Sequence, residues 1–262
     1  MEQYLKIIYI CFVRSLLRDL SFKTNLVIRF FTDSFYFVIY FIYFSVLFTK
    51  VPDINGWSEY EVLLLMGTFH TIFSFFLAFF LPNLSAIPGL VREGRLDGLL
   101  LKPVDTQFLL SINNVDIGSI SNIFLGLALV TYSIHALELK ITVIKILYYI
   151  FFILVGASIH YCIFFIFLMT AFWMQNATWC IGFFLSLNNF MDKPLVIYRG
   201  LLGRILTYLI PIALVANIPA NILLEKDIGQ ISSTAFFILL VLYCAGRYLW
   251  KAGLNYYEGA SI

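Results

Sequence analysis

Charged residues are scarce in this chain of 262 residues, where Asp, Glu, Lys and Arg together make up 12% of the sequence. Soluble domains carry roughly 25% charged residues, whereas 61% of the residues here are hydrophobic. The apolar residues also come in runs of about 20, the helical length that crosses the hydrocarbon layer of a bilayer. The composition excludes an ordinary soluble domain and predicts an all-α integral membrane protein whose solvent is lipid.

Motifs for nucleotide hydrolysis and for catalysis are missing. The sequence contains no GxxxxGK[ST] motif and no Gly-Lys pair, so it lacks a P-loop for ATP and Mg²⁺. HExxH and GxSxG are absent too, and the three histidines are far apart: His70, His135 and His160. A hydrogen bond between helices is the simplest role for a histidine inside a span. We therefore expect no enzyme activity and no cofactor on this chain.

Cysteine is also sparse, and none of the four cysteines forms a CxxC pair. They stand far apart, mostly in apolar runs, as expected of small apolar side chains rather than metal ligands or disulfides. We expect no metal site. The formal net charge of +2 gives no reason to expect a nucleic-acid partner.

The first 24 residues lack the uninterrupted apolar core of a cleavable signal peptide, because Lys6, Arg14 and Arg18 interrupt it. At 100° per residue, the apolar side chains gather on a face that excludes these three cations: Leu5, Tyr9, Phe12, Leu16 and Leu20. This pattern predicts an interfacial helix over residues 1–24, lying in the membrane surface. The alternative is a frayed start to the first span.

The apolar runs predict about six transmembrane helices in a single domain, residues 1–262. The clear spans cover residues 25–48, 62–81, 108–134, 144–173 and 231–249. The region between the last two is ambiguous. Either a short fifth span at 173–192 precedes a proline-broken re-entrant pair at 198–224, or residues 201–224 form the fifth span. Lys and Arg in residues 1–24, in the 82–105 loop and after the last span predict cytoplasmic N and C termini. A six-span topology places four further cations outside, so the positive-inside rule is only partly satisfied: Lys193, Arg199, Arg204 and Lys226.

Polar residues at membrane depth are costly, so two groups need an explanation. Arg29 and Asp33 are four residues apart and share a helix face, which predicts a local ion pair near the cytoplasmic end of the first span. Asn113, Asn114 and Asp116 form a cluster early in the third span. This cluster either bonds neighbouring helices or faces a hydrated cavity.

The stretch GLVREGRLDGLLLKPVD, residues 89–105, has a higher density of charge than its surroundings. Read as one helix between Pro88 and Pro103, it combines polar side chains with an apolar stripe. The polar side chains are Arg92, Glu93, Arg95 and Asp97, and the stripe is Leu96, Leu99 and Leu100. Such a helix suits docking into a groove of a partner. The alternative is a solvated loop that helps to set the topology.

Three segments resemble bacterial ABC (ATP-binding cassette) transporter permeases of the type-2 exporter class. EGRLDGLLLKPVD is similar to the signature loop of that family, including its basic-Pro pair, here Lys102 and Pro103. WKAGLNYYEGASI resembles the family's ending, although Tyr257-Glu258 is followed by Gly-Ala-Ser in an altered order. KPLVIYRGLLGRILTYLIPIALVANIPANILL resembles its proline-marked segment before the final helix.

The resemblance implies a six-span permease of a bacterial cytoplasmic membrane with an N-terminal interfacial helix. It pairs with a second permease, the same or a related chain, on two ABC ATPase subunits that hold ATP and Mg²⁺. Residues 89–103 would be the cytoplasmic coupling helix, and residues 198–224 a re-entrant gate near the outer face. The resemblance favours the short fifth span. The alternative is an ion-coupled secondary transporter or channel. Its site would be formed by Asp33, Asp116 and the helix break near Pro211.

Overall fold

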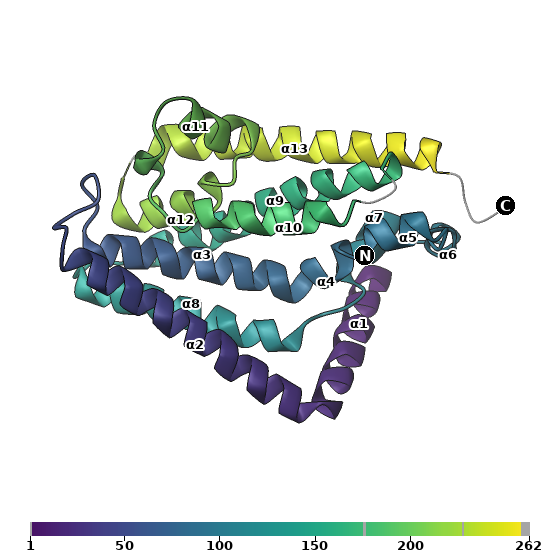
Figure 1. The fold of residues 1–262 in the computed structure, drawn as a ribbon, viewed down its shortest axis with the longest axis horizontal. Coiled ribbons are helices and arrows are strands. Elements are labelled where there is room, and N and C mark those ends of the chain that lie inside the picture. Colours follow the sequence, from purple (N-terminus) through teal and green to yellow (C-terminus); the bar gives the residue numbers. More distant parts are fainter. Residues whose placement is uncertain (1, 175–176, 227, 258–262) are drawn as a thin grey trace.

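The computed structural model describes residues 2–174, 177–226 and 228–257, and within these residues the regular structure is helical (Figure 1). The first half contains α1 (Glu2–Ser21), α2 (Lys23–Phe48), α3 (Glu59–Phe79), α4 (Leu81–Leu84), α5 (Ile87–Arg92), α6 (Asp97–Leu100), α7 (Thr106–Ile112) and α8 (Ile117–Ala136). The second half contains α9 (Val143–Met169), η1 (Thr170–Phe172), α10 (Trp179–Leu187), η2 (Asn188–Phe190), η3 (Leu195–Ile197), α11 (Gly200–Arg204), η4 (Ile205–Leu209), α12 (Leu214–Leu224) and α13 (Ile228–Tyr256).

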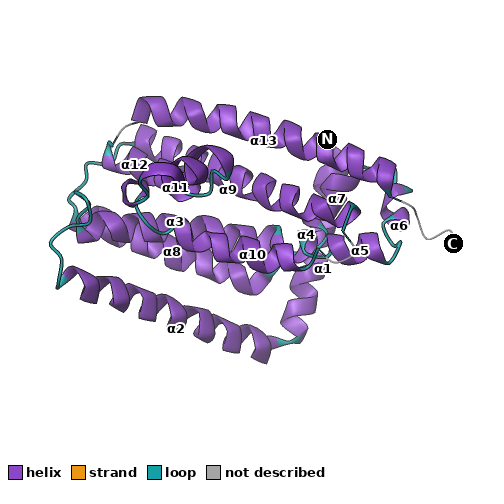
Figure 2. Cartoon of the chain, turned by 45° about the horizontal axis from the view of Figure 1, so that its top comes forward, coloured by secondary structure: helices purple, strands orange, loops and turns teal. Residues whose placement is uncertain are grey.

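The long helices α2, α3, α8, α9 and α13 run along one bundle axis (Figures 1 and 2). In the described part of the chain, five helices are long and apolar enough to cross a membrane. The start of α1, the end of α13 and the short helices α4–α7 lie at one end of the bundle, which we call the terminal end (Figure 1). Residues 49–58 lie at the other end, the loop end, and α1 runs across the bundle axis. The all-α membrane architecture predicted from composition is therefore confirmed.

The third span begins later than predicted. The apolar run 108–134 is divided between α7 and α8, because the chain leaves the helix at Asn113 and re-enters it only after Asp116. The Asp116 amide donates to the Ala78 carbonyl of α3 at 2.8 Å, so this backbone bonds a neighbouring helix instead of its own. The final span is longer than predicted, because α13 extends to Tyr256, beyond the predicted end at residue 249.

The ambiguous region between α9 and α13 first returns to the loop end and then folds back on itself. α10 runs beside α9 towards the loop end, where Arg199 donates to the Asn55 side chain at 3.3 Å (Figure 1). Residues 200–209 and α12 then meet at a bend of 93°. Lys226, after α12, pairs with Glu61 at the start of α3 at 2.8 Å. Residues 199–226 thus start and finish at the loop end.

Proline chemistry explains the bend. Pro211 lacks a backbone N–H and disfavours helical torsions at the preceding residue, and Ile210 has φ −122° and ψ 78°. Asn217 of α12 then fixes the returning arm. Its side chain accepts from the Leu195 amide at 2.9 Å and donates to the Lys193 carbonyl at 3.1 Å. The hairpin is thereby held against the segment that follows α10.

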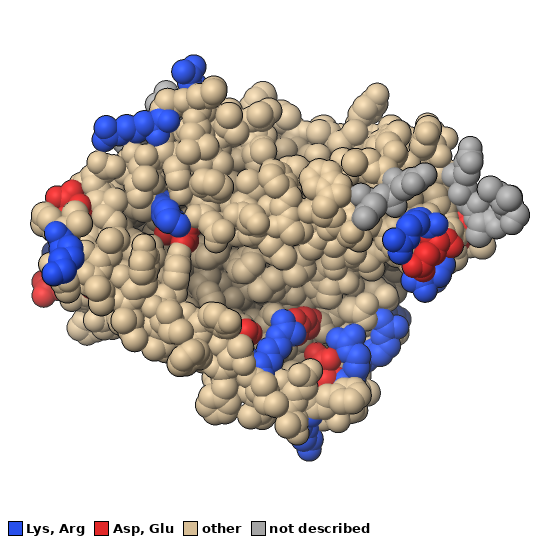
Figure 3. Space-filling view, viewed as in Figure 1, with Lys and Arg blue, Asp and Glu red and all other residues tan. Residues whose placement is uncertain are grey.

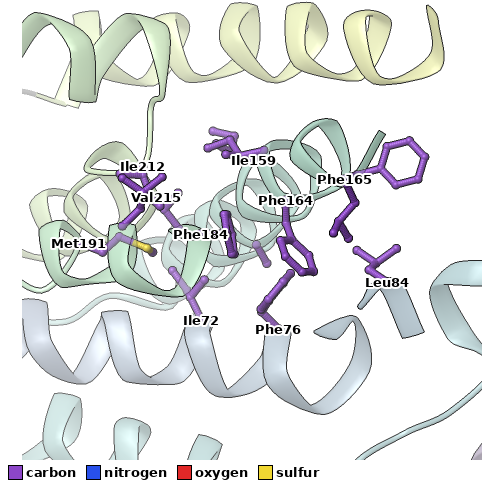
Figure 4. Close-up of a cluster of buried hydrophobic side chains, with 14 of the residues drawn as sticks. Ile72, Phe76, Leu84, Ile159, Phe164, Phe165, Phe184, Met191, Ile212 and Val215 are labelled. Carbon is purple, nitrogen blue, oxygen red and sulfur yellow. The ribbon is translucent and has the colours of Figure 1, made fainter. Parts of the chain in front are cut away.

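The core joins α3, α9 and α10 through fully buried aromatic side chains, including Phe76, Phe164 and Phe184 (Figure 4). Helices in lipid associate by close packing rather than by the hydrophobic effect. The contact of α3 with α8 illustrates this, because a Cβ added to Gly126 would lie 2.7 Å from the Thr71 backbone nitrogen. Glycine at this position permits the backbones to approach each other closely.

Candidate functional site

The short helices α4–α7 connect α3 to α8 at the terminal end. Pro82 and Pro88 occupy the first turns of α4 and α5, where a missing N–H breaks no helical hydrogen bond. Asn83 is buried and donates to the carbonyls of Ser111 and Asn114 at 3.1 Å and 2.6 Å. It also accepts from the Asn114 amide at 2.7 Å. This one side chain therefore ties the start of the connection to its end.

Residues 89–103 form two short helices, so the prediction of a single helix is wrong. Gly94 adopts φ +66° after α5. Its amide donates to the Val91 carbonyl at 3.3 Å, and the Arg95 amide donates to the Leu90 carbonyl at 3.0 Å. These two bonds form the Schellman motif that ends many helices. We call residues 87–102, which include α5, this turn and α6, the coupling segment.

The charged side chains of the coupling segment are exposed and partly paired. Glu93 accepts from Arg95 at 2.9 Å and lies 3.6 Å from Arg92. Between 45% and 67% of each of these side chains is exposed, so the pairs are weak and the charges accessible. Lys102 is exposed as well, whereas Asp97 is half-buried.

The leucines of the coupling segment do not form the predicted exposed stripe. Leu96 is fully buried in the protein's own core, and Leu99 packs against that core. Leu100 is 37% exposed, and Leu101, which the helical pattern left out, is 86% exposed. The turn at Gly94 rotates α6 relative to α5, which changes the leucines that reach the surface. Leu100 and Leu101 thus form the accessible apolar edge.

Behind this surface, the coupling segment packs on the terminal ends of α9 and α13. Ile87 and Leu96 share a buried cluster with Phe172, which follows α9, and Trp250 of α13. The rings of Phe172 and Trp250 are 5.7 Å apart. A Cβ on Gly253 would lie 2.3 Å from the Phe172 ring. Close packing makes the segment mechanically continuous with both helices.

The chain after α13 also reaches the coupling segment. The ring of Tyr257 lies 6.3 Å from that of Phe172, edge to face. Burial raises the pKa of the Tyr257 phenol, and the negative charge of Asp97 raises it further. The phenol is therefore neutral at physiological pH. The last five residues of the family-like ending, 258–262, lie outside the described part of the chain.

The intramembrane polar residues form one network at the α7–α8 break. Arg29 Nε lies 3.9 Å from Asp33 Oδ2, which confirms the predicted ion pair, and Arg29 Nη2 lies closer still to Asp116 Oδ2, at 2.6 Å. Asp33 also accepts from the Asn122 side chain at 2.7 Å. Asp116 also accepts from the Ser119 hydroxyl at 2.9 Å. Both carboxylates therefore bond neighbouring groups, and the cluster joins α2 to α8.

Helix α1 contributes residues that the sequence did not single out. Arg14 donates to the Asn113 carbonyl at 2.7 Å, and Arg18 donates to the Asn114 side chain at 3.2 Å. Ser15 accepts from the Val115 amide at 2.9 Å. The spacing of residues 14, 15 and 18 on one helix face was the available signal. The break between α7 and α8 is thus capped by side chains of α1.

The histidines and cysteines add no reactive site. His160 is fully buried, with its ring 4.4 Å from Phe76 and 4.8 Å from Phe184. Neither ring nitrogen of His160 has a hydrogen-bond partner, which contradicts the expected interhelical hydrogen bond. The four cysteines are free thiols. Among the described residues, no three His, Cys, Asp or Glu side chains come close enough to hold a metal ion.

On the face seen in Figure 3, charged side chains lie in separate groups towards the left end, at the lower middle and towards the right end, and most of the remaining surface is uncharged. This distribution suits a protein that crosses a bilayer.

Comparison with known proteins identifies one family. Its profile, described as ABC-2 family transporter protein, matches residues 35–261. Neither the curated proteins nor the solved structures gave a match. The match covers most of the chain, including the coupling segment, and the chain therefore belongs to the ABC-2 family of transporter proteins.

Proposed function

We propose that this protein is the membrane-spanning permease subunit of an ATP-driven ABC exporter and that its coupling segment docks into a partner ATPase. Permeases of the family are non-enzymatic membrane subunits that associate with such an ATPase. One observation carries the proposal: Leu100 and Leu101 are exposed on the same segment as Arg92 and Arg95, and this segment is held in the core by the buried Leu96. Apolar anchors ringed by charge are typical of protein interfaces.

The energy source is on another chain. The sequence has no P-loop, so ATP and Mg²⁺ bind the partner ATPase subunits. Five side chains of the coupling segment supply polar contacts to that partner: Arg92, Glu93, Arg95, Asp97 and Lys102. Leu100 and Leu101 supply the apolar contact, while Leu96 and Leu99 hold the segment to its own bundle. This division of roles replaces the apolar stripe predicted from sequence.

The terminal end faces the cytoplasm of a bacterial cell membrane, and α1 lies in the cytoplasmic membrane surface. Three observations support this orientation. Lys and Arg are concentrated near that end. Helix α1 runs across the bundle axis (Figure 1). Its apolar residues Leu5 and Tyr9 are 61% and 69% exposed, as an interfacial helix requires.

A second permease, identical or related, completes the translocation pathway. Helix α2 supports this proposal, because Phe44 is its only buried residue, whereas Phe31, Phe35 and Tyr36 are at least 65% exposed. An aromatic face of this size suits a partner helix as well as lipid. Residues 199–226 enter and leave from the outer leaflet and form an external gate next to the pathway.

Coupling requires that the two states of the ATPase pair contact the permease differently. When the ATPases close around ATP, they displace the coupling segment. Helix α5 packs on η1, which includes Phe172, and η1 contacts both α9 and α13, so the displacement reaches these two helices. The pathway between the two permeases then switches sides. Purification of the chain together with a soluble ATPase tests the proposal.

The alternative function is an ion-coupled secondary transporter or channel. It would need an intramembrane carboxylate that binds and releases an ion. Asp116 is paired with Arg29, and Asp33 accepts from Asn122, so each carboxylate is already held within the bundle. These contacts favour the exporter.

A further inference from the structure

A groove of about 610 Å³ lies between α7, α9 and α13, on a different part of the terminal end from the coupling surface. Its size is within the range of small-molecule sites. Ser158 and Tyr243 are exposed at its mouth, which opens to the surroundings of the bundle. Because these are membrane-crossing helices, the molecules that meet the mouth are lipids.

One end of the groove carries a fixed cation beside a fixed anion. Arg247 Nη1 donates to Asp105 Oδ2 at 3.2 Å and to Gln107 Oε1 at 2.8 Å. Gln107, which is 8% exposed, donates in turn to the Tyr161 hydroxyl at 3.2 Å. That hydroxyl shares a hydrogen bond of 2.7 Å with Ser111. The network holds both charges in place at the groove wall.

Polarity changes along the groove in the direction of the bundle axis. Arg247 lies eight residues after Leu239 on α13, about 12 Å nearer to the terminal end. The groove wall also has apolar side chains, which include Ile112, Cys162 and Leu239. The pair of Arg247 and Asp105 therefore lies towards the terminal end, and Leu239 lies towards the middle of the bundle. A phospholipid of the adjacent leaflet has the same polarity along the same axis.

We infer that this groove binds one zwitterionic phospholipid whose headgroup ends in a primary ammonium. Its phosphate accepts from Arg247, its ammonium donates to Asp105, and an acyl chain lies along Leu239 and Cys162. Charge complementarity selects this headgroup. An anionic lipid with an uncharged alcohol headgroup brings no cation for Asp105, which must then share Arg247 with the phosphate. A choline headgroup has no N–H with which to donate to the Asp105 carboxylate.

Native mass spectrometry of the delipidated full-length protein tests the site. The protein is titrated with phosphatidylethanolamine, phosphatidylcholine and phosphatidylglycerol of identical acyl chains. We expect one tightly held phosphatidylethanolamine, with the other two lipids bound about tenfold more weakly. Arg247→Gln and Asp105→Asn should each weaken phosphatidylethanolamine about tenfold. Arg92→Gln, which removes an exposed cation at the same end, should leave it unchanged.

A second variant, Leu239→Trp, fills the groove and leaves the polar network intact. It therefore separates loss of lipid binding from loss of the fold. It should abolish retention of the tightly held lipid and preserve the thermal unfolding transition. Equal binding of the three headgroups by the wild-type protein would overturn the inference, as would unchanged binding by Arg247→Gln. Retention of the lipid by a folded Leu239→Trp protein would also contradict it. None of these outcomes depends on the ATPase.

Discussion

Arg29 Nη2 lies 2.6 Å from Asp116 Oδ2 and thereby joins α2 to the start of α8 across 87 residues of sequence. Helix α2 is otherwise loosely attached, with Phe44 as its one buried residue near the loop end. Together with the hydrogen bond from Asn122 to Asp33, the ion pair attaches α2 to α8 near the terminal end. It also fixes the backbone break on which α1 docks, so α1, α2 and α8 meet at a single polar cluster.

Replacement of Arg29 by Gln should lower the free energy of unfolding by about 1–3 kcal/mol, because Asp116 would lose its charged partner. The measurement is thermal unfolding in detergent. Lys6→Gln is the matched control, since its pair with Glu2 is exposed and contributes little. The charge-swapped pair Arg29→Asp with Asp116→Arg should recover part of the loss. A melting temperature for Arg29→Gln equal to that of the wild type contradicts the role of the pair.

Substitution of Gly94 by Ala should strain the turn between α5 and α6. A positive φ costs a residue with a Cβ about 1 kcal/mol or more of conformational free energy, and Gly94 has φ +66°. We expect weaker binding of the partner ATPase in a pull-down at equal protein concentrations. Gly98→Ala is the control, because nothing lies within 4 Å of its added methyl group. Equal binding by the two variants would show that the turn does not shape the docking surface.

Gly253→Ala should disrupt the contact between α13 and the end of α9. The added Cβ would lie 2.3 Å from the Phe172 ring, and overpacking of this kind costs about 1–3 kcal/mol. The expected result is a lower melting temperature and an ATPase that binds but is no longer stimulated by the permease. Gly182→Ala, whose methyl group meets no neighbour within 4 Å, should behave as the wild type. Normal stimulation by Gly253→Ala would exclude this route of coupling.

The orientation can be tested by labelling single cysteines with a membrane-impermeant maleimide. In a background with the four native cysteines replaced by Ala, Arg199→Cys and Lys226→Cys should both react in intact cells, because both positions lie at the loop end. Arg95→Cys should react only after the membrane is opened. Reaction of Arg199 and Lys226 variants from opposite sides would mean that residues 199–226 cross the membrane.

Sequence patterns predicted the elements that depend on length and apolarity. Helices α2, α3, α9 and α13 follow from uninterrupted apolar runs, whose only solution in lipid is a helix. Pro211 and Pro219 predicted a broken segment over 198–224, and Pro211 stands at the 93° bend, whereas Pro219 lies inside α12. The resemblance to the family was also correct. These features are local, so composition and proline position are sufficient to find them.

Features that depend on contacts distant in sequence were not predictable. The i, i+4 spacing favoured Arg29 with Asp33, but Asp116 is closer because α8 starts beside α2 in the folded bundle. Likewise, helical periodicity placed Leu96 on an exposed stripe, whereas the turn at Gly94 directs it into the core. A single positive φ reorients the residues that follow it. Tertiary packing therefore decided the site residues that periodicity assigned wrongly.

Co-purification of the partner ATPase tests the central claim most directly. The wild-type chain, expressed together with the ABC ATPases of its source organism, should retain one of them through affinity purification. Arg95→Glu combined with Leu101→Glu should release it without a change in melting temperature. The same charge changes at the loop end, Lys50→Glu with Val51→Glu, should have no effect. Equal retention by the Arg95 and Leu101 variant, or full transport by the permease without any ATPase, would contradict the account.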